Sequence, residues 1–157
     1  IASLPLMDSR LAYAKLFEED ILLAIHKDSH VNDYFKNKDD NNLTIEDLNK
    51  LRSESFIMCQ KGRNLRDISI AICHKAGFEP NIVYETPSCE NITEMILQDI
   101  GLGFVPRRTI EAYPPDRRPR YYRILDDISS QTFVLAYREG ALSRAAQAFY
   151  SIMTEND

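Results

Sequence analysis

The chain has 157 residues with a formal net charge of −5, and 44% of the residues are hydrophobic and 27% charged. This length suits one domain or two small lobes, and the apolar fraction excludes a disordered chain. The apolar run Ile21–Ile25 is far shorter than the roughly 20 residues that a membrane-spanning helix needs, so we expect no membrane partner. No signal peptide is visible, and because the chain starts with Ile1 in what reads as the end of a strand, we expect a piece of a longer protein.

Strand and helix patterns alternate along the chain. Alternating or continuous apolar residues predict strands at 11–27, 56–59, 81–85, 101–106, 121–125 and 131–139. Helices are predicted at 44–50, 64–75 and 88–99, with a last one after residue 143. The segment 32–42, rich in Asn, Asp and Lys, predicts an exposed loop. This alternation indicates an α/β fold with mostly parallel strand pairing.

Each predicted helix follows a residue of a type that favours the N-cap position. Thr44 stands three residues before Asp47, which predicts a reciprocal capping box. Asn64, Ser88 and Ser143 are the candidate N-caps of the other three helices. We therefore expect these side chains to accept hydrogen bonds from backbone N–H groups in the first helical turns.

The charge distribution argues against nucleic-acid binding by this chain alone, because phosphate contacts need clustered Lys and Arg. One segment, Arg107–Arg123, does carry six arginines beside Tyr121 and Tyr122, which is typical of a nucleic-acid backbone binder. The same segment holds prolines and acidic residues, which favour a solvated loop followed by a strand. We expect the loop and strand, with nucleic-acid contact as the alternative.

The cysteines, Cys59, Cys73 and Cys89, are odd in number and lack metal-ligand spacing, so we expect neither a metal nor a cofactor. Their apolar or helix-forming neighbours predict small core residues in a reducing cytoplasm. Cys59 also precedes Lys61 and Arg63, whose charges would lower the pKa of its thiol. A reactive Cys59 is therefore the alternative to a buried one.

Several motifs of this chain follow one another in the order and spacing of a known family. They are FEEDILLAIHKDSH, TIEDLNKLRSESFIM, GRNLRD with KAGFEP, IVYET before GLGFVP, and FVLAYREG before AAQAF. Over about residues 12–153 the chain resembles the effector-binding domain of LysR-type transcriptional regulators. The resemblance implies an α/β, two-lobed fold like that of the type 2 periplasmic binding proteins, with one lobe complete and one partial. Residues 28–131 would form the middle lobe, and residues 1–27 and 132–157 a partial outer lobe.

The resemblance implies a sensing domain for a small-molecule effector, for which an anion is a candidate, and not an enzyme. It further implies a homodimer or tetramer in the cytoplasm that reaches DNA only through an N-terminal winged helix-turn-helix absent from this chain. The residues themselves also argue against an enzyme, because His26, His30 and His74 are scattered and no nucleophile or phosphate-loop motif is present. A solute-binding protein of a transport system would share the fold and is the alternative.

Two predicted helices begin directly after strands, at the strand ends where open α/β folds bind ligands. The first N–H groups of a helix are unpaired donors at the positive end of its dipole, so they suit small anions. The predicted ligand-binding residues are Gln60, Lys61, Gly62, Arg63, Asn64, Leu65, Thr86 and Ser88. In the resembling family, Asn64 and Leu65 fall on effector-contact positions of the loop after the strand.

Competing interpretations apply to the same residues. Asn64 and Ser88 could serve only as helix caps, and Asp67 and Glu90 in the first turns would weaken binding of a dianion. In the peroxide-sensing branch of the family a reactive cysteine precedes LRD and a second lies on the same helix. Here Asn64 stands at the first position and Cys73 at the second, so this pair cannot form.

Overall fold

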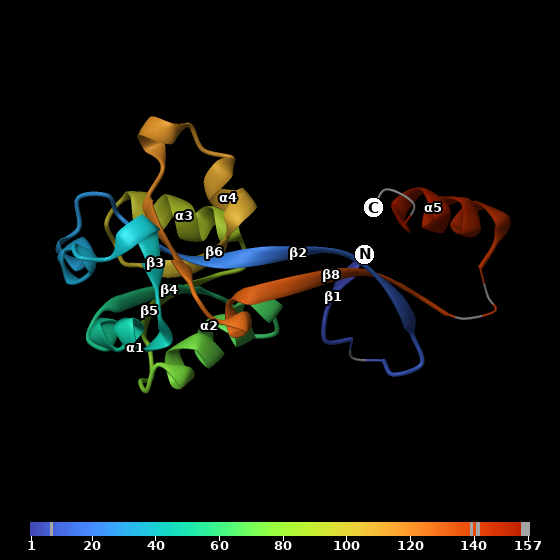
Figure 1. The fold of residues 1–157 in the computed structure, drawn as a ribbon, viewed down its shortest axis with the longest axis horizontal. Helices are drawn as coiled ribbons and strands as arrows, with labels where there is room; N and C mark the ends of the chain where they lie inside the picture. The colour runs from blue at the N-terminus through green and yellow to red at the C-terminus, as the bar shows by residue number, and fades with distance from the viewer. Residues whose placement is uncertain (7, 139, 141, 155–157) are drawn as a thin grey trace. The chain divides into compact units, whose positions relative to one another are not determined.

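The computed structural model describes residues 1–6, 8–138, 140 and 142–154 (Figure 1). Contacts divide the chain into two compact units, one of residues 20–129 and one of residues 1–19 with 130–157. The chain passes between the units within β2 (Ala12–Ile25) and at the start of β8 (Ser130–Tyr137). The predicted lobes have the same order along the chain, but the predicted first boundary, after residue 27, lies later than the observed one, after residue 19. The assignment of these units as a middle lobe and a partial outer lobe stays a prediction.

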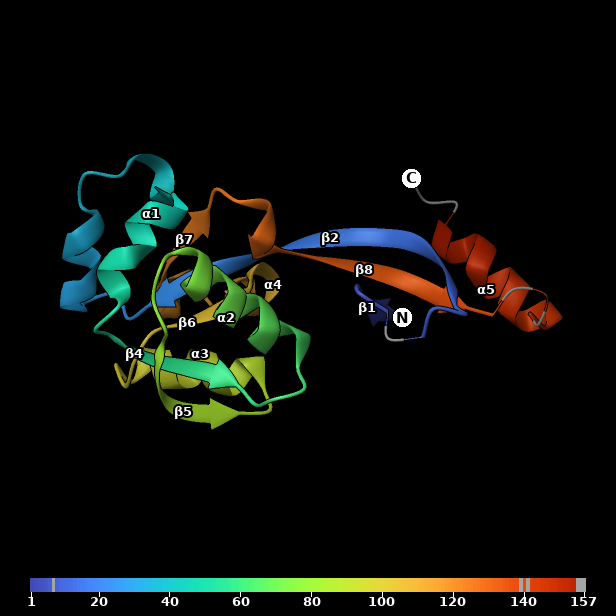
Figure 2. The ribbon, with the colours of Figure 1, turned by 90° about the horizontal axis from the view of Figure 1, so that it is seen from below.

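The larger unit contains two sheets (Figure 2). In the first, β2 pairs antiparallel with both β6 (Gly103–Pro106) and β7 (Arg120–Ile124), and β7 pairs parallel with β3 (Asn42–Leu43). In the second, β4 (Ser55–Cys59) and β5 (Asn81–Thr86) run parallel. The prediction of mostly parallel pairing is therefore wrong. Parallel pairs arise from strand–helix–strand crossovers such as β4–α2–β5, whereas β2 runs opposite to both of its neighbours in this unit.

The helices of this unit begin close to where the sequence predicts them. Those predicted are α1 (Ile45–Leu48), α2 (Asn64–Lys75) and α3 (Cys89–Leu97). A fourth helix, α4 (Arg107–Glu111), lies where the sequence predicts a loop. The capping box at Thr44 and Asp47 is confirmed, because each side chain bonds the backbone N–H of the other residue. Short 3₁₀ turns lie at His30–Phe35, Asp39–Asn41, Asn49–Leu51, Pro115–Arg117 and Asp127–Ser129.

The hydrophobic core of the larger unit lies between its sheets and helices. Its fully buried side chains include Ile21, Leu22, Leu23, Phe56, Ile57, Ile72, Ile92, Ile96, Phe104 and Tyr122. β2 and β4 contribute continuous apolar runs, as expected for strands covered on both faces. This core fixes the ends of β4 and β5, and with them the starts of α2 and α3.

The predicted exposed loop at 32–42 is wrong at its first residues. Asn32 and Phe35 lie on the turn His30–Phe35 and are 7% and 1% exposed. The Asn32 amide donates to the backbone carbonyls of His26, Lys27 and Ser29 and accepts from the Tyr122 hydroxyl. Because its polar atoms are satisfied in this way, Asn32 is buried at little cost, which composition alone does not reveal.

The smaller unit has little buried apolar surface. β1 (Ala2–Ser3) pairs antiparallel with β8, and Phe17 of β2 stacks on Phe133 of β8 with ring centroids 4.8 Å apart. In α5 (Arg144–Thr154) none of the described side chains is buried. The predicted cap is confirmed, because the Ser143 hydroxyl accepts a hydrogen bond from the Ala146 N–H.

Within the described residues, no helix combines the length and apolar character needed to cross a bilayer.

Candidate functional site

The two segments predicted to bind ligand lie next to each other in the larger unit. β4 and β5 run side by side with their carboxyl ends at the same edge (Figure 2). Cys59 is paired with Thr86 in the sheet, and the Gln60 N–H donates to the Thr86 carbonyl at 3.0 Å. The starts of α2 and α3 therefore share one edge, although they are distant in sequence.

The turn after β4 presents backbone to solvent. Gln60, Lys61, Gly62 and Arg63 are all exposed, whereas Leu65 is 6% exposed and belongs to the core. Gly62 has φ +82°, and no described heavy atom lies within 4 Å of the place where a Cβ would stand. A ligand can therefore approach the backbone of this turn closely, and Leu65 can contribute only through its own backbone.

The start of α2 differs from the prediction by one residue. Arg63 is the N-cap, with extended φ and ψ of −105° and 132°, and Asn64 is the first helical residue. The predicted cap at Asn64 is therefore wrong, because the helix begins one residue earlier than the residue preference suggests. Among the described contacts, the Arg63 side chain makes no capping hydrogen bond. The N-cap residue of α2 therefore does not compete with a ligand for the first backbone N–H groups of the helix.

The start of α3 is occupied by its own side chains. The Ser88 hydroxyl accepts the Asn91 N–H at 3.3 Å and donates to Glu90 Oε2 at 2.6 Å, which confirms Ser88 as a cap. Buried Thr86 accepts from the Ser88 N–H and the Asn91 side chain. The Ser88 hydrogen bond also lowers the pKa of Glu90, so a carboxylate stands at this helix end. Asp67 likewise stands in the first turn of α2, so the two helix starts differ in the cap at Ser88, which α3 has and the N-cap residue of α2 does not supply.

Arg66 joins the ends of the two strands. Its Nη1 donates to the Cys59 carbonyl at 2.8 Å and to Glu85 Oε1 at 2.5 Å, and its side chain is 11% exposed. A charge-assisted pair of this kind fixes both strand ends at once. Lys61 and Arg63 remain as the exposed cations beside the turn.

The three thiols have different surroundings. Cys59 and Cys73 are buried, as predicted for core cysteines, and Cys89 is half-buried. The hydrogen bond from Cys89, aided by the charges of Arg63 and Arg66, lowers the pKa of the Cys59 thiol against the opposing effect of burial. Burial raises the pKa of Cys73 to about 12. The alternative of an activated Cys59 therefore has structural support that Cys73 lacks.

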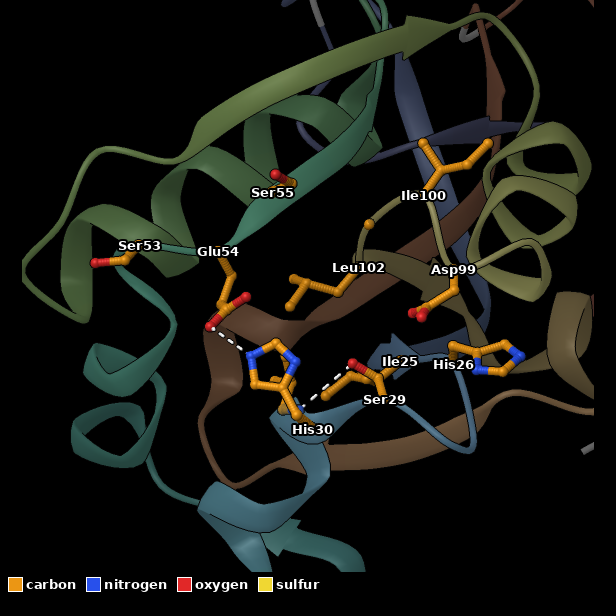
Figure 3. A pocket seen from close by; sticks show the side chains of 12 residues that line it. Ile25, His26, Ser29, His30, Ser53, Glu54, Ser55, Asp99, Ile100 and Leu102 are labelled. Carbon is orange, nitrogen blue, oxygen red and sulfur yellow. Dashed lines mark hydrogen bonds and ion pairs between the residues drawn. The ribbon is translucent and has the colours of Figure 1, made fainter.

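A cavity of about 220 Å³ lies at the other end of β4, where no sequence motif predicts a site (Figure 3). Its lining comes from three separate segments, residues 25–31, 53–55 and 99–102. Glu54 lies 3.6 Å from His30 Nε2 and accepts the Tyr34 hydroxyl at 3.0 Å. No motif joins these segments, so only the fold brings their imidazole, carboxylate and hydroxyl groups together.

The arginine-rich segment uses several of its cations inside the chain. Arg107 pairs with Asp20 at 2.7 Å, Arg118 donates to the Tyr113 carbonyl, and Arg120 lies over the Tyr122 ring. These contacts favour the structural interpretation over nucleic-acid contact. The prediction of a loop is wrong at its start, where residues Arg107–Glu111 form the short helix α4. The prolines of the segment favour a loop, so the sequence pattern did not predict this helix.

Across the described residues, no cluster of His, Cys, Asp or Glu could hold a metal ion.

The whole chain, residues 1–157, matches the family model of the LysR substrate binding domain. The uncharacterized HTH-type transcriptional regulator YwbI of Bacillus subtilis is 30% identical over 65% of this chain and 34% of its own length. The DNA-binding transcriptional dual regulator OxyR of Escherichia coli is 26% identical over 83% of this chain and 40% of its own length. The chain thus spans less than half the length of these two curated relatives.

Solved structures confirm the fold. The CcmR regulatory domain of Synechocystis PCC6803, in complex with 2-PG, has a TM-score of 0.81 at 19% identity and covers 99% of this chain and 72% of that one. The effector binding domain of QuiR, in complex with shikimate, has a TM-score of 0.75 at 14% identity and covers 95% and 66%. The predicted α/β fold of the type 2 periplasmic-binding-protein kind is therefore confirmed. The chain belongs to the LysR substrate-binding domain family, whose members are the effector-binding domains of LysR-type transcriptional regulators rather than enzymes.

Proposed function

We propose that this domain binds a small anionic metabolite at the carboxyl ends of β4 and β5. The observation that carries the proposal is the turn Gln60–Arg63, where an exposed backbone meets a helix start without a side-chain cap. Lys61 and Arg63 supply positive charge there, and Gly62 permits close approach. Backbone N–H groups at such a helix start are suited to carboxylate or phosphate oxygens.

The start of α3 has a secondary role in this proposal. Thr86 and Ser88 already hydrogen-bond within the chain, so they shape the edge of the site rather than serve as its main donors. Asn64 contributes from the first turn of α2, and Leu65 through its backbone. Two similar regulatory domains were solved with small molecules, 2-PG and shikimate, which supports a small-molecule ligand for this one as well.

We further propose that the parent protein is a cytoplasmic DNA-binding regulator that acts as a homodimer or tetramer. The curated relatives are HTH-type regulators, and with a net charge of −5 this domain is unsuited to holding DNA by itself. Ligand binding would shift an equilibrium between conformations of the domain and thereby the placement of the DNA-binding heads. The relatives give no support to the alternative of a transport solute-binding protein.

A ligand screen followed by one substitution tests the site. Metabolites that raise the melting temperature of the parent regulator identify ligands, because binding to the native state stabilises it. For an anionic hit, we expect Lys61→Ala to weaken binding roughly tenfold, about 1–2 kcal/mol, with an unchanged melting temperature of the free protein. Isothermal titration calorimetry measures the affinity.

Lys36→Ala is the matched control, because Lys36 is also an exposed lysine but lies outside the site, on the segment 32–42, and pairs locally with Asp33. It should leave the affinity unchanged. If Lys61→Ala and Gly62→Val both bind a confirmed effector as tightly as the parent, the ligand does not lie over this turn. The start of α3 at Thr86 and Ser88 would then be tested next.

A further inference from the structure

Two cysteines from different elements meet at the edge where β4 and β5 end. Cys59 is the last residue of β4, and Cys89 is the first residue of α3. Cys59 is paired with Thr86 in the sheet, only three residues before Cys89 along the chain. This register brings the Cys89 side chain within hydrogen-bonding reach of the Cys59 thiol, an interaction that lowers the pKa of Cys59.

The surroundings of the two thiols divide the roles between them. Cys89 is half-buried and can be reached by a small molecule, whereas Cys59 is 3% exposed. The position of Cys59 is fixed by the Arg66 side chain, which binds its carbonyl oxygen. The hydrogen bond with Cys89 and the charges of Arg63 and Arg66 lower the pKa of the Cys59 thiol against the opposing effect of burial, and a lowered pKa favours the nucleophilic thiolate.

We propose that Cys59 and Cys89 form a reversible disulfide by exchange with a low-molecular-weight disulfide. The Cys89 thiolate attacks one sulfur of the small disulfide, forms a mixed disulfide and releases the first small thiolate. The Cys59 thiolate then attacks the Cys89 sulfur, forms the Cys59–Cys89 bond and displaces the second small thiolate. Two protein thiols are oxidised by two electrons, the small disulfide is reduced to two thiols, and the two thiol protons pass to the departing thiolates.

This pair lies beside the proposed effector site, and it differs from the positions that the family resemblance singled out. Those positions hold Asn64 and Cys73, and Cys73 is fully buried on α2 with its pKa raised to about 12. A thiol in that state neither reaches solvent nor ionises near neutral pH. Cys73 therefore serves as an internal control within the same chain.

The experiment uses reduced and oxidised glutathione as the redox buffer. The purified protein is equilibrated at a series of ratios, quenched in acid, denatured and labelled with a maleimide, and its intact mass is then measured. We expect the number of labelled thiols to fall from three to one as the buffer becomes oxidising, without bound glutathione. Peptide mapping should join Cys59 to Cys89.

Variants separate this outcome from nonspecific oxidation. Cys73→Ser should fall from two labelled thiols to none, whereas Cys89→Ser should form no internal disulfide. Since Cys89 is half-buried, Cys89→Ser should fold, and near-ultraviolet circular dichroism checks this. Three labelled thiols in excess oxidised glutathione, stable glutathione on Cys89, or a disulfide that includes Cys73 would each overturn the proposal.

Discussion

The two ends of β4 carry two different kinds of surface. At its carboxyl end, an exposed turn and a helix start present backbone groups, and the site around Gly62 is empty of neighbouring atoms. At its amino end, side chains such as His30 and Glu54 surround a cavity, and the backbone is closely packed. There a Cβ on Gly101 would stand 2.7 Å from the Ser55 carbonyl oxygen. One strand thus ends in exposed backbone on one side and in a cavity lined by side chains on the other.

This difference shows which kind of surface can be predicted from the order of strands and helices. A helix start after a parallel strand creates donors from the backbone alone, so the proposed site at the carboxyl end follows from the element order. The cavity at the amino end depends on which side chains three unrelated segments bring together. Each end can be disturbed separately, which makes the contrast testable.

The largest effect is expected from Gly101→Ala at the amino end. The added methyl group would overlap backbone atoms of Ser55, which belong to the strand and cannot rotate away. We expect a loss of about 1–3 kcal/mol in the free energy of unfolding, measured by urea denaturation. Ser53→Ala, on an exposed residue that lines the same cavity, should change it by less than about 0.5 kcal/mol. Equal stability of the two variants would show that the amino end is not closely packed.

An intermediate effect is expected from Arg66→Gln at the carboxyl end. The change removes the charge that joins the Cys59 carbonyl to Glu85, at a cost of about 1 kcal/mol because Glu85 is 40% exposed. Loss of a nearby cation should also raise the pKa of the Cys59 thiol and slow its alkylation at neutral pH. Mass spectrometry of the alkylated peptides measures the alkylation rate of Cys59. An unchanged rate would show that the Arg66 charge does not affect the Cys59 thiol.

The smallest effect is expected from acid titration of Glu90 at the start of α3. The hydrogen bond from Ser88 lowers the pKa of this carboxyl below its ordinary value of 4.5. A lowered folded-state pKa stabilises the fold above the ordinary value, and this contribution is lost as the pH falls through the folded-state pKa. Glu90→Gln should therefore show a slightly smaller drop in melting temperature between about pH 5 and pH 3. An identical acid profile in both proteins would contradict this.

The sequence predicted the local elements well because local signals determine them. The capping box at Thr44, the caps at Ser88 and Ser143, and the end of α2 at Lys75 all depend on neighbouring residues. The predicted cap of α2 was wrong because it rested on the residue preference for Asn alone, whereas the helix has Arg63 at the N-cap and already includes Asn64.

Features that depend on distant residues were not predictable. The antiparallel pairing of β2 with β6 and β7 depends on the direction in which β2 runs through the unit. The contact between Cys59 and Cys89 depends on sheet register, and the cavity beside Glu54 depends on three segments. For the candidate site, the sequence indicated the two segments, and the structure added which helix start is open and which is occupied.

The buried Asn32 side chain has a consequence for how this sequence can vary. Its amide nitrogen faces three carbonyl oxygens, and its oxygen faces one hydroxyl, so aspartate would set negative charge against those carbonyls and leucine would leave them unsatisfied. In a saturation library we expect position 32 to accept very few residues, while exposed Asn37, in the same polar stretch, accepts many. Two asparagines five positions apart thus differ greatly in how far the fold constrains their substitution.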